Sequence, residues 1–271
     1  MKNFYIKSCY YYRSDDQAID IYSPSSDTKI LIESTYFKQC STNANYPCVS
    51  VGDRGNFVQN RVCYVQCKGG DKGELISSQT DFYQLNFNKI FESTILYNGH
   101  NNSNNPALYF CNGIIQISKV NISHNFNKVN SGYFMYNYHP ESIINYTNID
   151  NNTQTEGHVA VHIETPFKLL TDIVLHIFSC NYIRNTGRSS IFYTEINGII
   201  SIEQSCIADN NVNHTFYIQS GNVLLDSSYC DSNTTFNKNK PQIMNQLENY
   251  SEISNQFQLQ SACEVKIDKI I

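Results

Sequence analysis

Few side chains in this sequence stand at spacings typical of a reaction centre or a metal site. His158 and His162 lie four residues apart, but apolar residues alternate with them, as they do on a strand. On a strand the two imidazoles would both point outwards, roughly 13 Å apart, and could not share one metal ion. Cys63 and Cys67 also lie four residues apart, but no second Cys/His pair stands at zinc-finger spacing from them. These residues therefore predict no metal site.

The chain segments that must position any functional residue follow a repeat of about 27 residues. Counted back from one mostly polar position, here called position zero, apolar or small residues recur at −10, −8, −5 and −3. Nine such copies end at residues 14, 40, 67, 98, 125, 152, 185, 210 and 233. One more segment of alternating residues, typical of a half-buried strand, lies between each position zero and the next copy. Short strands repeated nine times without helical segments predict an all-β parallel β-solenoid, or β-helix, of about nine coils.

The amino-acid composition argues against some classes of function. The 271 residues include 20 Tyr and no Trp, and the net charge of −5 offers no basic surface to nucleic acid. No stretch approaches the roughly 18–20 apolar residues of a membrane span, and the first residues lack the apolar segment of a signal peptide. We expect residues 1–233 to form the β-helix and residues 234–271 a polar linker, with 257–263 as a candidate capping strand.

Position zero is polar in most copies. Six copies carry asparagine there, namely Asn98, Asn125, Asn152, Asn185, Asn210 and Asn233. Asparagine tolerates a left-handed backbone and hydrogen-bonds its own turn. Stacked at one corner of successive coils, the amides are expected to bond to one another along the rod. Cys40 and Cys67 hold position zero in two adjacent copies, where they could form a disulfide or remain reduced packing residues.

These columns resemble the right-handed parallel β-helices of the pectate-lyase-like class. The short coils rich in Asn and Cys resemble in particular the surface-protein families of parabasalid protists such as trichomonads. The resemblance covers roughly residues 1–233 and implies an extracellular or cell-surface protein with a glycan or protein ligand. The motifs of β-helix lyases and polygalacturonases do not occur, because Trp, Asn-Thr-Asp, Gly-His-Gly and Arg-Ile-Lys are all missing. No residue of this sequence therefore corresponds to a catalytic residue of those enzymes.

One outward column brings two carboxylates together. Glu203 and Asp226 share position −7 in adjacent copies, and Phe178 holds that position in the copy before them. Carboxylates about 5 Å apart would suit a retaining glycosidase or a Ca²⁺ site; the alternative is two solvated side chains that lean apart. The outward neighbours Gln204 and Ser227 offer no hydrophobic pocket of the kind that raises the pKa of a general acid. We interpret the column as a weak binding site, with Phe178 as a stacking surface.

Charges on the outer columns are otherwise few. Arg61, Glu92 and Lys119 share position −6 in three successive copies, which predicts a surface charge ladder. The sequence thus favours a structural or binding module without catalytic residues or a cofactor, used at the cell surface or in secreted form for display or adhesion. The alternative is a glycan-active hydrolase or lyase built on the same scaffold.

Overall fold

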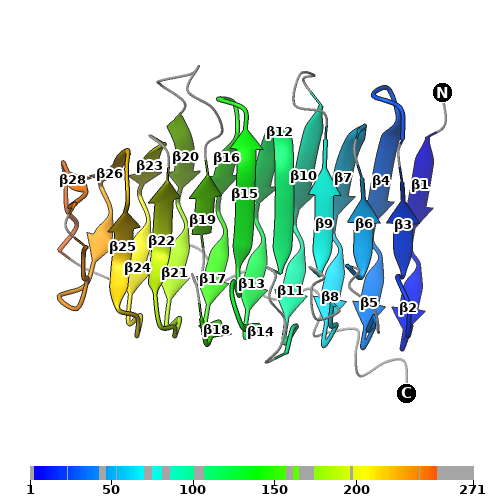
Figure 1. Ribbon diagram of the computed structural model, residues 1–271, viewed down its shortest axis with the longest axis horizontal. Coiled ribbons are helices and arrows are strands. Elements are labelled where there is room, and N and C mark those ends of the chain that lie inside the picture. Colours follow the sequence, from blue (N-terminus) through cyan, green and yellow to red (C-terminus); the bar gives the residue numbers. More distant parts are fainter. Residues whose placement is uncertain are drawn as a thin grey trace.

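The computed structural model describes residues 3–22, 24–42, 47–52, 54–69, 75–80, 86–100, 107–156, 161–164, 174–195, 198–237 and 239–248. Within these ranges the chain forms 28 strands and no helix. Every strand pair is parallel and joins residues about one repeat apart, so the coils stack side by side along a rod (Figure 1). This arrangement confirms an all-β parallel β-solenoid with a period near 27 residues.

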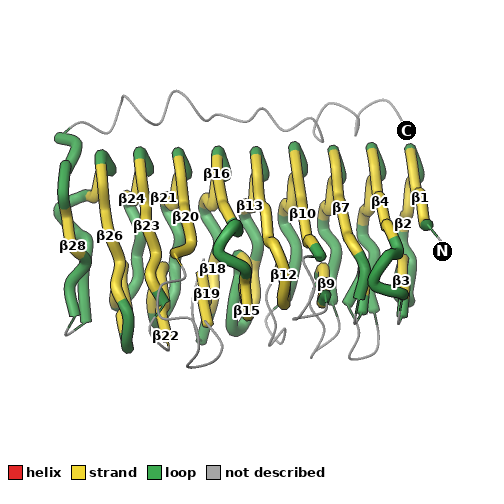
Figure 2. The backbone as a smooth tube through the Cα atoms, turned by 90° about the horizontal axis from the view of Figure 1, so that it is seen from above, coloured by secondary structure: helices red, strands yellow, loops and turns green. Residues whose placement is uncertain are grey.

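The strands stack into three faces of the rod (Figure 2). The first face contains β1 (Phe4–Lys7), β4 (Lys29–Glu33), β7 (Asn56–Asn60), β10 (Phe87–Phe91), the second half of β12 (Leu108–Ser118), β16 (Ile143–Asn145), β20 (Val174–Phe178), β23 (Ile199–Glu203), β26 (Asn222–Asp226) and β28 (Gln242–Ile243). The second face is a nine-stranded sheet of β2 (Tyr10–Tyr12), β5 (Tyr36–Lys38), β8 (Cys63–Val65), β11 (Thr94–Leu96), β13 (Asn121–Ser123), β17 (Asn148–Asp150), β21 (Asn181–Ile183), β24 (Cys206–Ala208) and β27 (Tyr229–Cys230).

The third face completes each coil. It contains β3 (Ile19–Ile21), β6 (Val49–Val51), β9 (Ile76–Gln79), the first half of β12, β15 (Tyr133–Tyr138), β19 (Val161–Glu164), β22 (Ser190–Glu195) and β25 (His214–Ile218). Two short strands, β14 (Phe126–Asn127) and β18 (Thr153–Gln154), pair just after position zero. Because β12 runs from the third face onto the first, these two faces form one 17-stranded sheet.

The turn inside β12 depends on two residues with a positive φ. Asn112 has φ 65° and Gly113 has φ 75°. A Cβ atom added to Gly113 would collide with the backbone oxygen of Asn86. Glycine is therefore required where β12 passes from one face to the next.

The strand register reproduces the columns expected from the repeat. At position −3, direct neighbours in successive coils are Tyr11, Phe37, Tyr64, Ile95, Ile122, Ile149, Tyr182, Ile207 and Cys230. The side chains of this column point into the rod and pack at the coil spacing. The rings of Tyr11, Phe37 and Tyr64 stack with centroids 4.8 and 4.6 Å apart, close to the ~4.8 Å between paired strands.

Aliphatic columns fill the rest of the interior. At position −8 the residues Ile32, Ile117 and Ile177 are each 0% exposed, and most other coils carry an aliphatic residue there. Burying one such side chain stabilises the fold by roughly 1.5–3 kcal/mol. A coil cannot bury its inward face alone, so stability comes from neighbouring coils that cover one another.

Two columns of left-handed residues form the corners on either side of the second face. At position −6, φ lies between 45° and 55° for Ser8, Ser34, Arg61, Glu92, Lys119, Tyr146, Ser179, Gln204 and Ser227. At position −1, φ lies between 51° and 56° for Arg13, Gln39, Gln66, Tyr97, His124, Asn151, Arg184 and Asp209. The expectation that the asparagines of position zero themselves adopt this backbone is wrong. The turn is made one residue earlier, which directs the position-zero side chain into the rod.

Position −6 allows a direct test of the backbone cost at these corners. Gln204 is exposed and has φ 47°. Gln204→Gly is expected to raise the free energy of unfolding by about 1 kcal/mol, because glycine adopts a left-handed backbone without a Cβ clash. Gln204→Val is expected to lower it by about 1 kcal/mol, because a β-branched side chain increases that clash. Urea denaturation measures the free energy of unfolding of both variants. Equal stability of the two variants would contradict the left-handed backbone assigned to residue 204.

The stacked strands extend beyond residue 233, where a polar linker is expected. β28 pairs with β26, and Ser228 forms a bridge with Gln246. Phe236 stacks on Phe216 with ring centroids 5.9 Å apart and packs against the core. Because of these apolar contacts, the chain after residue 233 continues the stack where a polar linker was expected. The candidate capping strand at 257–263 lies outside the described residues.

Candidate functional site

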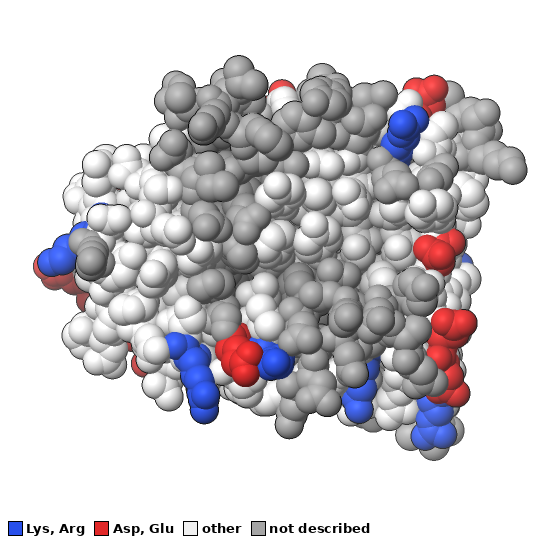
Figure 3. All heavy atoms as spheres, viewed as in Figure 1, with Lys and Arg blue, Asp and Glu red and all other residues white. Residues whose placement is uncertain are grey.

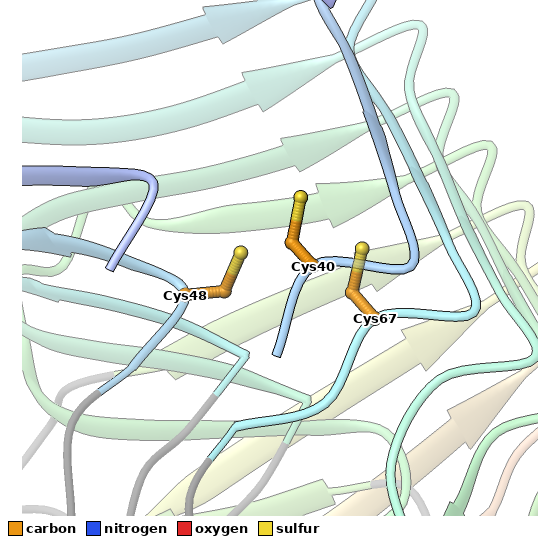
Figure 4. Close-up of side chains that lie close together, drawn as sticks. All are labelled: Cys40, Cys48 and Cys67. Carbon is orange, nitrogen blue, oxygen red and sulfur yellow. The ribbon is translucent and has the colours of Figure 1, made fainter. Parts of the chain in front are cut away.

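Three thiols meet inside the rod at the corner between the second and third faces. Cys40 and Cys67 hold position zero in adjacent coils, after β5 and β8, and Cys48 stands immediately before β6. All three are 0% exposed. Their Sγ atoms all lie within 4.8 Å of one another. Figure 4 shows the three side chains projecting to the same side.

In later coils this corner holds a ladder of asparagine amides. Each Oδ1 accepts the backbone N–H of the position-zero residue in the preceding coil, at 2.7–3.0 Å. Each Nδ2 donates to the carbonyl oxygen of position −3 in that coil, at 2.8–3.1 Å. The members are Asn98, Asn125, Asn152, Asn185 and Asn210. Asn233, predicted as a sixth member, is exposed in the turn after β27 and bonds to none of them.

The thiols replace the amides where the ladder reaches the earlier coils. The Cys67 N–H donates to Asn98 Oδ1 at 2.7 Å, so the amide ladder ends on a cysteine. Cys40 Sγ lies 3.5 Å from the carbonyl oxygen of Tyr11, the acceptor that an asparagine amide would use. Because cysteine is smaller than asparagine, this corner has room for the third thiol, that of Cys48.

Hydrogen bonds and burial shift the pKa values of the three thiols in different directions. Bonds from Cys48 and Cys67 lower the pKa of Cys40. The bond to Cys40 raises the pKa of Cys48 well above its usual value, and burial raises the pKa of Cys67. Backbone hydrogen bonds from Ser14 to the Cys40 sulfur and from Cys40 to the Cys67 sulfur also favour negative charge there. The hydrogen bonds at this corner therefore favour negative charge on Cys40 and disfavour it on Cys48.

Such a cluster has two chemical uses. Thiolates bind soft metal ions, and two thiols can be oxidised to a disulfide with an S–S bond of about 2.05 Å. Cys40 and Cys67, for which the sequence leaves a disulfide open, are both free thiols in the structure. Cys48 is missed by sequence reasoning because it lies outside position zero. The feature of the sequence that could have indicated Cys48 is its position directly before an alternating segment, where an inward-pointing side chain is expected.

The predicted outward column lies on the first face. Glu203 and Asp226 are register partners at the ends of β23 and β26, and Phe178 pairs with Glu203 from β20. The three side chains are half-buried. The ring of Phe178 is perpendicular to the exposed ring of Tyr146, with centroids 5.8 Å apart and an interplanar angle of 86°.

Neighbouring groups bond both carboxylates of this column. Ser201 Oγ donates to Glu203 Oε1 at 2.9 Å, and His176 Nδ1 lies 3.7 Å from the same oxygen. Asn245 Nδ2 donates to Asp226 Oδ1 at 2.8 Å. Among the described residues, polar donors bond both carboxylates, and the ring of Phe178 is the apolar group beside Glu203.

The predicted charge ladder is confirmed. Arg61 Nε lies 2.9 Å from Glu92 Oε2, and Lys119 Nζ lies 3.6 Å from Glu92 Oε1. The hydrogen bond from Arg61 lowers the pKa of the Glu92 carboxyl. All three side chains are exposed, so the ladder stabilises the fold little. Charges are also sparse on the face in Figure 3, among the residues it describes.

Two further findings bear on function. The side chains of His158 and His162 lie outside the part of the chain that the structure describes. Over the described ranges the fold contains no helix of the length and apolarity that crossing a membrane takes. Comparison with known proteins yields no match to a family model, to a curated protein or to a solved structure.

Proposed function

We propose that this chain is a rigid binding module whose first face binds a glycan and catalyses no reaction. The binding surface consists of Tyr146, His176, Phe178, Glu203 and Asp226, here called the aromatic–acidic surface. The observation that carries the proposal is the register of β20, β23 and β26, which sets the ring of Phe178 next to Glu203 and Glu203 next to Asp226 on the first face. The resemblance to surface proteins of protists adds the expectation that the module works outside the cell.

The chemistry of the aromatic–acidic surface fits a sugar. Tyr146 is 39% exposed and its ring is perpendicular to that of Phe178, so part of this aromatic surface is accessible to a ligand. An accessible aromatic face packs against the C–H groups of a pyranose ring. The carboxylates of Glu203 and Asp226 accept hydrogen bonds from sugar hydroxyls, and a bond to a charged acceptor is stronger than a neutral one.

The same surroundings favour binding over hydrolysis. A glycosidase keeps one of its two carboxyl groups protonated by placing it in an apolar pocket. Glu203 and Asp226 instead accept hydrogen bonds from the hydroxyl of Ser201 and the amide of Asn245, respectively. The alternative, a glycan-active hydrolase or lyase, would need a catalytic acid that this surface does not provide.

A glycan array with the purified chain tests the proposal. Phe178→Ala is expected to weaken binding of the best glycan at least fivefold, because the stacking surface is lost. Tyr217→Ala is the matched control, since it removes a half-buried ring from the third face, where Tyr217 stacks on Tyr193 at 5.5 Å. Binding that resists Phe178→Ala, or no glycan bound at all, would contradict the proposal.

The double variant Glu203→Gln/Asp226→Asn separates binding from catalysis. It is expected to weaken glycan binding, with and without Ca²⁺, while product formation from polysaccharides stays at background in both proteins. Reproducible turnover by the unmodified chain that the double variant loses would favour the hydrolase or lyase instead.

A further inference from the structure

We propose that Cys40, Cys48 and Cys67 form a three-coordinate binding site for a soft d¹⁰ metal ion, with Cu(I) as the ion that fits best. The site lies in the interior, on a different part of the rod from the aromatic–acidic surface. It is independent of the proposed glycan binding.

The sulfur positions are close to those of a metal-bound set. Metal–sulfur bonds of about 2.3 Å, arranged in a plane around one ion, place the three sulfurs about 4 Å apart. The three Sγ atoms already lie within 4.8 Å of one another, so closure needs shifts of less than about 1 Å. All three side chains project to the same side, which lets them converge on one point (Figure 4).

The donor set selects the class of metal. Three thiolates with no oxygen or nitrogen ligand select soft ions such as Cu(I) over Mg²⁺, Ca²⁺ or Mn²⁺. No His, Asp, Glu or further Cys of the described residues joins the group as a fourth ligand. Each cysteine is 0% exposed, so solvent does not readily supply one. Zinc is almost always four-coordinate in structural sites, whereas Cu(I) is stable with three sulfurs.

The fold also indicates that these cysteines are more than packing residues. Five other coils fill the same corner with asparagine, which gains two ladder hydrogen bonds per coil from its Oδ1 and Nδ2 atoms. Cys40 and Cys67 give up those amide bonds in adjacent coils, and it is here, within the described part of the chain, that a third thiol joins them. By contrast, Cys180 is a buried free thiol that belongs to no such group.

Surrounding groups support bound thiolates. Backbone hydrogen bonds from Ser14 and Cys40 reach two of the sulfurs, as outer-shell donors do at metal sites. The apolar side of the site is formed by the buried core around Tyr64. Cysteine binds metal as the thiolate, so the thiol protons leave to solvent as the ion binds, and no change of oxidation state is required.

Anaerobic titration of the reduced full chain with Cu(I), in competition with a Cu(I) chelator, tests the proposal. The unmodified chain is expected to bind one tight equivalent, and Cys48→Ala to bind at least 100-fold more weakly. Cys180→Ala, the matched buried control, is expected to bind like the unmodified chain. Equal affinity of Cys48→Ala and the unmodified chain would overturn the proposal, and so would the absence of a tight equivalent.

Two measurements on the unmodified chain keep the test decisive if Cys48→Ala fails to fold. X-ray absorption of the Cu(I) form is expected to show three sulfur neighbours at about 2.3 Å; a nitrogen or oxygen ligand, or only two sulfurs, would overturn the site. One equivalent of Cu(I) is also expected to displace pre-bound Zn²⁺ completely. Zinc that stays bound would show a four-coordinate site and refute the three-coordinate assignment.

Discussion

Replacing Asn152 by leucine is expected to lower the free energy of unfolding by about 1–3 kcal/mol. Asn152 is 0% exposed, its Oδ1 accepts the Asn125 N–H at 3.0 Å, and its Nδ2 donates to the Ile122 carbonyl at 2.8 Å. Leucine has nearly the same volume but leaves the Asn125 N–H buried without a partner, while the Ile122 carbonyl keeps only its bond within the sheet. Each unsatisfied group costs about 1–3 kcal/mol. Urea denaturation followed by far-UV circular dichroism measures the loss.

The same substitution at Asn148 is the matched control. Asn148 lies in the same coil but is half-buried, and its side chain makes one bond, at 3.1 Å to Asn121 Oδ1. Asn148→Leu is expected to change stability by less than about 1 kcal/mol, since its polar atoms remain close to water. If Asn152→Leu and Asn148→Leu are equally stable, the amide ladder contributes nothing.

Alkaline pH is expected to unfold the reduced protein between about pH 9 and 11, a larger effect than most single substitutions. Burial raises the pKa of Cys180, Cys206 and Cys230 to about 12, from an ordinary value of 9.0. Burial also raises the pKa of Tyr133 and Tyr182 well above the ordinary 10.0. The folded state keeps these groups neutral, whereas the unfolded chain ionises them at their ordinary values.

The sign of the pH dependence follows from those raised pKa values. The stability that comes from the neutral thiols is fully present below pH 9 and is lost as pH rises towards 12. At pH 10.5 each thiol removes roughly 2 kcal/mol and the three together about 6 kcal/mol. That loss is comparable to the 5–15 kcal/mol of net stability of a typical domain.

The free energy of unfolding, measured by urea denaturation at a series of pH values under reducing conditions, checks this dependence. Cys180→Ala is the informative variant. Its slope against pH is expected to be shallower by about 1.4 kcal/mol per pH unit above pH 9, one thiol's share. Stability that stays constant from pH 8 to 11 would contradict the predicted burial of the thiols.

Most of the fold could be predicted because its core depends on side chains at fixed offsets in the sequence. A residue such as Ile122 takes the register position that the repeat assigns to it, between Ile95 and Ile149. Parallel pairing with a constant offset leaves one way to bury these columns, since a slip of one residue would turn every inward side chain outwards. The column of Glu203 and Asp226 follows from the same offsets.

The thiol cluster and the corner geometry could not be predicted in the same way. Cys48 reaches Cys40 through a connection whose length differs from coil to coil, so no offset relates the two residues. The left-handed residue before each asparagine carries side chains as different as those of Tyr97 and Arg184, so composition does not mark it. Asn233 fits the spacing but lies in a turn that closes on itself, with Thr234 N–H bonded to the Asp231 carbonyl at 3.2 Å.

Because of the amide ladder, the rod can gain or lose whole coils without disruption of the remaining ones. Asn125 and Asn152 make the same pair of contacts to the coil before them, so each rung presents an equivalent surface to the next. Loss of residues 126–152 would set Asn185 directly upon Asn125 and leave every other rung unchanged. Unequal recombination between repeats can therefore shorten or lengthen such a gene without breaking the pattern of its product, whereas an indel of a few residues within a corner would break it.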